Sequence, residues 1–163
     1  RRTLEMISEL LRYQLYGGNQ KVSILQEIDY LKTYIALRKL RMSERLRLRV
    51  EFPPELNELN IYPLLFLPLV ENAFKYVGGD YQLDIIMKWE NNRISLFIRN
   101  SIPELSAEDE ALRKSVDERQ RKGIGLVNLR RRLSLLYPSK HRLETRKEET
   151  EFVAELMIEI EEI

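Results

Sequence analysis

Apolar residues in the first quarter of the chain recur every three or four positions, the spacing of one face of a helix. This pattern predicts two helices, over residues 3–16 and 24–43, separated by Gly-Gly-Asn at residues 17–19. Ser23 is a good N-cap for the second helix, and Gln26 is placed to complete a capping box. The two stripes consist of Leu4, Ile7 and Leu11, and of Ile24, Ile28, Leu31 and Ile35. We therefore expect an amphipathic helical hairpin, or a half-hairpin that a second copy completes.

From residue 45 onward the period changes to two, which is typical of half-buried strands. The expected strands cover residues 45–52, 81–89, 94–98, 141–147 and 151–160. Asn91 and Asn92 separate two of them and predict a hairpin turn. Helical spacing returns over residues 63–77 and 126–137, while residues 101–122 are long, charged and only weakly apolar. A stretch of that kind inside a small domain is usually functional or mobile.

The expected order is two helices followed by strand, helix, two strands, a long loop, helix and two strands. Because several strands pair as hairpins, we expect a mixed and mostly antiparallel sheet. Their alternation predicts helices on one face of the sheet and water on the other. The predicted fold class is therefore α+β, a two-layer α/β sandwich preceded by two helices. We expect residues 1–43 to form the helical segment and residues 44–163 the domain.

Composition limits the functional classes. Of the 163 residues, 44% are hydrophobic and 33% charged, as in a globular protein with a substantial core, and the net charge of +1 indicates no general affinity for nucleic acid or membranes. There is no cysteine, which excludes disulfides and the usual zinc sites. No apolar run reaches the roughly 20 residues that a membrane span needs. We expect no signal peptide, and we interpret the abrupt helical start as that of a fragment whose membrane portion would lie upstream.

Residues 67–76, LPLVENAFKY, combine helical apolar spacing with three side chains that a core helix does not need. Asn72 and Lys75 are three positions apart and share a helix face. An amide oxygen beside an ammonium group suits a metal-bound polyphosphate, because Mg²⁺ prefers oxygen ligands. Glu71 points about 100° away around the helix and could hold a water molecule or the attacking group. Taken singly, Glu71 is equally well explained as a surface residue, and Lys75 is better explained as one.

A second fragment, GIGLVN at residues 123–128, begins the helix that follows the long loop. Glycines let the backbone approach a phosphate, and the first N–H groups of a helix lack internal partners. The fragment does not have the P-loop spacing, and no parallel βαβ unit surrounds it as in a Rossmann fold. Alone it is as well explained by an ordinary glycine-rich helix start. Together with residues 67–76 it predicts a nucleotide site.

The first fragment resembles the N box of the GHKL-type ATPase domain shared by bacterial histidine kinases, gyrase-type topoisomerases, Hsp90 and MutL. Its form is most similar to the LytS-like class of sensor histidine kinases. Residues 123–133 resemble the glycine box of that class with the helix after it, and residues 23–44 resemble the helix that leads into the ATPase domain. The resemblance covers nearly the whole chain, with both boxes in the expected order. It implies the Bergerat (GHKL) fold.

The resemblance also implies ligands and roles. ATP and Mg²⁺ would be the cofactors, Glu71 the catalytic residue, and residues 101–122 the ATP lid. Asn72 would be the metal ligand. Lys75 would contact phosphate. Lys122, which lies beside the glycine box, could also contact phosphate. The remaining nucleotide contacts implied are Tyr76, Asn100, Gly123, Gly125, Leu126 and Asn128.

Three features depart from the family pattern. Tyr76 stands where the N box usually has histidine, and an aromatic ring there can still stack on adenine. Asn100 stands where the family's Asp-x-Gly-x-Gly box has its adenine-reading aspartate. Its neutral amide oxygen can still accept from the adenine amino group, although more weakly than a carboxylate. The phosphoacceptor histidine is absent and would lie before Arg1.

The resemblance predicts the catalytic domain of a two-component sensor histidine kinase, which transfers the γ-phosphoryl group of ATP to a histidine on an upstream helix. The partners implied are a second copy bound through the N-terminal helices and a response regulator with a LytTR-type DNA-binding domain. The implied location is the cytoplasmic side of a bacterial inner-membrane protein.

Two other functions remain open. The missing aspartate box favours a degenerate nucleotide-binding or scaffold module that signals through its helices. Another enzyme of the same fold, such as a serine kinase or a mechanical ATPase, is the third possibility. His141 is interpreted as a surface strand residue rather than a phosphoacceptor. The arginines at positions 45, 47 and 49 are interpreted as the polar face of a strand rather than a nucleic-acid site.

Overall fold

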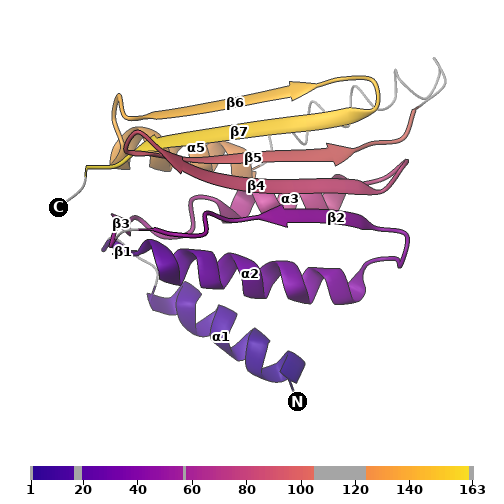
Figure 1. Ribbon diagram of the computed structural model, residues 1–163, viewed down its shortest axis with the longest axis horizontal. Helices are drawn as coiled ribbons and strands as arrows, with labels where there is room; N and C mark the ends of the chain where they lie inside the picture. The colour runs from indigo at the N-terminus through magenta and orange to yellow at the C-terminus, as the bar shows by residue number, and fades with distance from the viewer. Residues whose placement is uncertain (1, 17–19, 57, 105–123, 162–163) are drawn as a thin grey trace.

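The computed structural model describes residues 2–16, 20–56, 58–104 and 124–161 (Figure 1). Its helices are α1 (Arg2–Tyr16), α2 (Ile24–Arg41), α3 (Leu67–Tyr76) and α5 (Ile124–Leu136). Its strands are β1 (Val22–Ser23), β2 (Arg47–Glu51), β3 (Asn60–Ile61), β4 (Gln82–Glu90), β5 (Arg93–Ser101), β6 (His141–Lys147) and β7 (Glu151–Glu159). All the longer elements fall where the sequence pattern predicts them, with shifts of a few residues at their ends.

The main sheet has five strands in the order β2-β4-β5-β7-β6. β2 runs parallel to β4, and every other neighbouring pair is antiparallel. Asn91 and Asn92 form the turn between β4 and β5, and both have positive φ angles, of 51° and 61°. A two-residue hairpin loop of the favoured type requires this backbone at both positions, which asparagine tolerates. The predicted mixed, mostly antiparallel sheet is confirmed.

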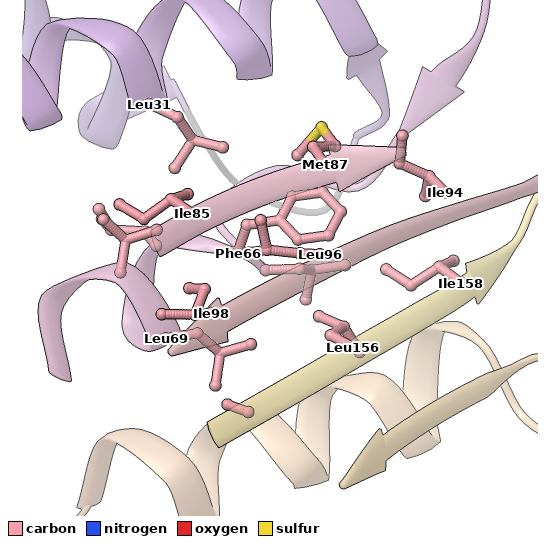
Figure 2. Packing of buried hydrophobic residues seen from close by; sticks show 14 of the residues in the cluster. Leu31, Phe66, Leu69, Ile85, Met87, Ile94, Leu96, Ile98, Leu156 and Ile158 are labelled. Atoms are coloured by element: carbon pink, nitrogen blue, oxygen red, sulfur yellow. The ribbon is translucent and has the colours of Figure 1, made fainter. Parts of the chain in front are cut away.

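One face of the sheet carries the hydrophobic core. The register aligns Ile98 on β5 with Ile85 on β4 and Ala154 on β7, and all three side chains are buried. Helices α3 and α5 lie behind this sheet (Figure 1). Figure 2 shows Phe66, Leu69 and the strand residues packed together in this core. The observed architecture is the predicted α+β two-layer sandwich.

The opposite face of the sheet is largely polar. Asp84 on β4 is only 2% exposed, although it lies on this face. Arg99 on β5 compensates its charge, with Nε 3.0 Å and Nη2 2.5 Å from the Asp84 Oδ2 atom. Glu151 on β7 lies 3.6 Å from the same Arg99 side chain. Cross-strand ion pairs of this kind lie on the face opposite α3 and α5.

The two N-terminal helices lie below the β2 edge of the sheet (Figure 1). Ser23 caps α2 by accepting a hydrogen bond from the N–H of Leu25 at 3.2 Å, rather than from Gln26. The apolar stripe of α2 belongs to the same buried cluster as the sheet, and α1 packs on α2. Residues on both sides of the expected boundary at residues 43 and 44 belong to this cluster, and the boundary itself stays a prediction.

The segment before α3 differs from the sequence prediction. α3 begins at Leu67, four residues later than predicted, because Leu64 has a positive φ of 62° that no α-helix accommodates. The short strands β1 and β3 were also not predicted. They pair with each other through Ser23 and Asn60, next to a hydrogen bond from the Ile24 N–H to the Leu59 carbonyl of 2.9 Å. These contacts attach the start of α2 to the segment that leads into α3.

Candidate functional site

Helix α3 buries one face and presents its polar residues on the other. Five of its apolar residues are buried: Leu67, Leu69, Val70, Ala73 and Phe74. Glu71 and Lys75 are exposed, while Asn72 and Tyr76 are half-buried. The Lys75 ammonium lies over the Tyr76 ring, with Nζ 5.3 Å from the ring centroid. The structure thus places the four predicted residues of this motif on the accessible side of one helix.

The C-terminal end of α3 is fixed to the end of β5. The N–H of Gly78 donates to the carbonyl of Ser101 at 2.9 Å, and the Ser101 hydroxyl donates to the carbonyl of Gly78 at 2.7 Å. The same hydroxyl oxygen accepts from the N–H of Gln82 at 2.8 Å. These bonds bring Asn100, the residue before Ser101, to the end of α3.

Asn100 is a buried polar residue, 2% exposed, on the helix-covered face of β5. Its neighbours in register are Leu83 on β4 and Phe152 on β7. Its Nδ2 atom donates a long hydrogen bond of 3.4 Å to the carbonyl of Ser101. Since a buried amide normally requires good partners, Asn100 is a reasonable place for a ligand to bind.

Close backbone contact defines the base of this region. Gly79 has a φ of +60°, and a Cβ atom added there would lie 2.8 Å from the carbonyl oxygen of Ile102. A Cβ atom on Gly78 would lie 3.1 Å from the Cδ atom of Pro103. Glycine is required at position 79 by both conformation and space. The two glycines therefore let the α3–β4 connection lie directly against residues 102–103.

Helix α5 provides another side of the candidate site. Gly125 lies in its first turn, where backbone N–H groups have no partner within the helix. Leu126 is buried and Asn128 is exposed, and α5 contacts α3. The remaining predicted ligands, Lys122 and Gly123, lie outside the described residues. So does most of the predicted lid.

A cluster that the sequence prediction missed lies between α2 and α3. The guanidinium carbon of Arg38, on α2, lies 5.6 Å from the centroid of the Phe74 ring, and the Tyr34 ring meets Phe74 edge-on at 6.4 Å. The Nε atom of Arg38 is buried and has no hydrogen-bond partner among the described residues. Apart from the helical spacing of positions 34 and 38, no local signal in the sequence places this pair beside α3.

The surroundings of Glu71 shift the pKa of its carboxyl. Although Glu71 is exposed as a residue, partial burial of its carboxyl raises the pKa above the ordinary 4.5, and the charge of Arg38 acts in the opposite direction. Burial also raises the pKa of Tyr34 to about 12, with Arg38 lowering it and Glu71 raising it. A carboxylate with a raised pKa is better suited to accept a proton near neutral pH than an unperturbed one.

The residues of this site are better suited to a magnesium ion that is also bound by nucleotide phosphates than to a metal ion bound by protein side chains alone. In the described parts of the chain, no group of three or more His, Asp or Glu side chains is arranged to hold a metal. Mg²⁺ in phosphate sites commonly takes only one or two protein oxygen ligands, with phosphates and water completing its shell. Asn72 could provide one such oxygen. ATP with Mg²⁺ is therefore chemically compatible with α3.

Two other sequence interpretations can be compared with the structure. His141 is half-buried on β6 rather than fully at the surface, and its Nδ1–H donates to the carbonyl of Tyr137 at 2.7 Å. Arg45 lies over the Tyr81 ring at 5.5 Å, and Arg49 pairs with Glu51 at 2.9 Å. His141 is thus the strand residue that was predicted, and Arg49 lies on β2 as predicted, but Arg45 lies in the turn before β2 rather than on the strand.

The chain resembles known proteins in both sequence and fold. A histidine kinase family model matches residues 1–46. The chain is 28% identical over 145 residues to the sensor protein kinase HptS of Staphylococcus aureus, covering 86% of this chain. It spans about 28% of the length of that relative.

Solved histidine kinases have the same fold at low sequence identity. The catalytic domain of histidine kinase ThkA, in a nucleotide-free form, matches with a TM-score of 0.54 and 17% identity, covering 86% of this chain and 96% of that one. Full-length ShkA in complex with AMPPNP matches with a TM-score of 0.58 and 12% identity. The match covers 98% of this chain and 35% of the ShkA chain.

No helix in the described residues is long and apolar enough to cross a membrane. The sequence match to HptS covers most of the chain, and the structural matches include isolated catalytic domains. The chain is therefore similar in sequence to sensor histidine kinases and has the fold of solved histidine kinase catalytic domains.

Proposed function

We propose that this chain binds ATP with Mg²⁺ and is the catalytic part of a sensor histidine kinase. The observation that carries the proposal is the accessible polar side of α3, which carries Asn72 and Lys75. The C-terminal end of this helix is bonded to the end of β5, and the helix also contacts α5. An amide oxygen, an ammonium group and unpaired helix N–H groups are together a set of phosphate and metal contacts. The relationship to HptS supports the kinase assignment.

In this proposal each wall of the site has a separate task. Asn72 binds the metal, which when present neutralises phosphate charge, and Lys75 contacts a phosphate oxygen. Gly125, Leu126 and Asn128 bring the start of α5 to the triphosphate, together with Lys122 and Gly123. Tyr76 and Asn100 contact the adenine at the other end. Catalysis by such a site comes mostly from positioning and charge stabilisation.

Glu71 is proposed to act on the nucleophile. The raised pKa of its carboxyl and its position one residue before Asn72 suit it to orient an attacking imidazole or accept its proton. The bond formed joins the imidazole nitrogen to the γ-phosphorus. The bond broken joins that phosphorus to the bridging oxygen, which leaves with ADP. The acceptor is proposed to lie outside these 163 residues, because the single histidine, His141, is held in β6 by Tyr137.

The partners are also proposals. Leu4 and Leu11 on α1 are 68% and 57% exposed and lie seven positions apart, as in a helix that packs on another copy. We propose a homodimer through the N-terminal helices, a response regulator that receives the phosphoryl group, and a position on the cytoplasmic side of a membrane-anchored protein. A LytTR-type DNA-binding domain on that regulator rests on the family resemblance alone.

Calorimetric titration of the chain with ATP, with and without Mg²⁺, tests the proposal. We expect saturable binding that strengthens when Mg²⁺ is present. The absence of saturable binding at millimolar ATP would overturn the kinase assignment.

The same experiment addresses the main alternative, a scaffold module without kinase activity. Asn100 in place of a carboxylate favours that alternative, because the adenine loses a charged acceptor. Another enzyme of the same fold would bind ATP equally well. Mixing the chain with a separately produced phosphoacceptor helix that contains histidine, serine or neither would distinguish these enzymes by the residue that becomes phosphorylated.

A further inference from the structure

Glu27 is a charged residue with no exposed surface, and the proposed chemistry does not use it. Burial raises the pKa of its carboxyl, while hydrogen bonds from Tyr13 and Leu64 and the charge of Arg132 act in the opposite direction. Oε1 accepts from the N–H of Leu64 at 2.6 Å, and Oε2 accepts from the hydroxyl of Tyr13. A buried carboxyl is tolerated only with partners of this kind. Glu27 is therefore a fixed junction between segments.

Leu64 is held at both ends of its backbone. Its N–H donates to Glu27, and its carbonyl accepts from Nη1 of Arg132 at 3.3 Å. Nη2 of Arg132 donates to the neighbouring carbonyl of Pro63 at 3.0 Å. Because Leu64 has a φ of 62°, this backbone conformation requires such support. The two side chains together determine where the chain turns into α3.

Glu27 lies on α2, and its contacts connect this helix to α1, to the start of α3 and to α5. Tyr13 lies on α1, Leu64 lies three residues before α3, and Arg132 lies on α5. α3 carries Asn72 and Lys75, and the first turn of α5 carries Gly125 and Leu126. One carboxylate thus links α1 to both helices that border the candidate nucleotide site.

Tyr13 is the part of the junction that a movement of α1 would displace first. Its ring stacks on Tyr30 of α2, with centroids 4.6 Å apart, and its hydroxyl reaches Glu27. Leu10 lies three positions before Tyr13 on α1 and packs on the same core. Its apolar side chain cannot form a hydrogen bond to Glu27. Leu10 therefore offers a matched variant that weakens the contact between α1 and the core but leaves the junction intact.

We infer that Glu27 is a positioning residue through which the placement of α1 controls nucleotide binding, by holding Leu64 at the start of α3 and, with Arg132, the spacing between α3 and α5. This inference rests on the proposed function for its ligand. When Tyr13 keeps its bond to Glu27, the site has its binding geometry. When the bond is lost, the Glu27 side chain can move away from the Leu64 N–H, and the start of α3 becomes less ordered.

The experiment compares Tyr13→Phe with Leu10→Ala in the full chain. We expect Tyr13→Phe to weaken ATP binding roughly fivefold, the equivalent of one hydrogen bond, and Leu10→Ala to change it less than twofold. We also expect Tyr13→Phe to have no further effect in a Glu27→Ala background, because the two residues would act through one interaction.

Amide hydrogen exchange provides a second measurement that needs no ligand. Tyr13→Phe should accelerate exchange at Leu64, Leu69 and Val70 more than Leu10→Ala does, after correction for global stability. If the wild-type chain binds no ATP, the proposed function fails and exchange alone decides the role of Glu27. Equal exchange at α3 in both variants, or equal and additive losses of ATP affinity, would show that the junction is only structural.

Discussion

The carboxylate of Glu27 on α2 accepts a hydrogen bond from the backbone N–H of Leu64, across 37 positions of sequence, with 2.6 Å between Oε1 and N. Leu64 is in turn three residues from the start of α3, the helix that carries the candidate metal and phosphate contacts. The N-terminal helices and the nucleotide site are thus joined by a bond inside the core rather than by a surface contact.

Glu27→Ala should lower the free energy of unfolding by about 1–3 kcal/mol, because it leaves the N–H of Leu64 without its acceptor in the core. Glu27→Gln keeps an oxygen that can accept from that N–H, so its free energy of unfolding should fall less than that of Glu27→Ala. Urea denaturation of the two variants measures the difference. Equal stabilities of Glu27→Ala and the wild type would show that water replaces the carboxylate at no cost.

The pH dependence of stability should also depend on Glu27. Burial raises the pKa of its carboxyl in the folded chain above the ordinary 4.5, so the folded state holds this proton more tightly than the unfolded state. The contribution of Glu27 is therefore largest below pH 4.5 and falls as the pH rises through the raised pKa. Glu27→Gln cannot titrate and should lack this fall.

Urea denaturation of both proteins across a pH series from 4.5 to neutrality isolates this contribution, because the other titrating groups are shared. The wild type should lose stability relative to Glu27→Gln as the pH rises. A constant difference between them, or one of the opposite sign, would contradict the raised pKa.

Local patterns predicted most of the fold. Ile94, Leu96 and Ile98 recur at every second position, and this period predicts which side of β5 faces the helices, although Phe97 lies on the other side. The turn at Asn91 and Asn92 is likewise encoded by the two residues that adopt it. These elements need no information from distant parts of the chain, which is why sequence reasoning located them.

The missed features depend on distant contacts. The late start of α3 follows from Leu64, whose backbone is set by Glu27 and Arg132, 37 and 68 positions away. The sequence around residue 63 instead predicts a helix with proline in its first turn. β1 and β3 are two residues long and exist only because they pair with each other. No periodicity can be read from so few residues.

In the candidate site, too, the positions that follow from local spacing were predicted and the contacts between distant segments were not. The residues on α3 follow from helical spacing, which placed Asn72 and Lys75 on one side. The proximity of Arg38 to Phe74 could not be read from the sequence, because it depends on how α2 crosses α3. The role of each site residue remains a proposal.

Gly79→Ala should destabilise the fold by about 2 kcal/mol or more, because residue 79 has a φ of +60° and its Cβ atom would lie 2.8 Å from the Ile102 carbonyl oxygen. Gly78→Ala is the matched control. Its Cβ atom would approach the ring of Pro103 most closely, at 3.1 Å, and position 78 has no positive φ, so the loss of stability should be smaller. Thermal unfolding of both variants compares them, and an equal loss would contradict the conformational role of Gly79.

Asn100→Asp should have opposite effects on the free and the nucleotide-bound protein. A carboxylate at this buried position faces the Ser101 carbonyl and should lower the melting temperature of the free protein. It should tighten ATP binding roughly three- to tenfold, because a charged acceptor makes the stronger hydrogen bond to the adenine amino group. Calorimetry with ATP and with GTP tests this, and weaker ATP binding would show that Asn100 does not contact adenine.

The central claim is that the polar side of α3 binds magnesium and ATP, and Asn72→Ala tests it most directly. Asn72 is half-buried and lies outside the buried core, so the variant should keep the melting temperature of the wild type within a few degrees. Calorimetric titration with ATP in the presence of Mg²⁺ should show saturable binding to the wild-type chain and none to Asn72→Ala. Equal affinities of the two proteins for ATP with Mg²⁺ would contradict the account.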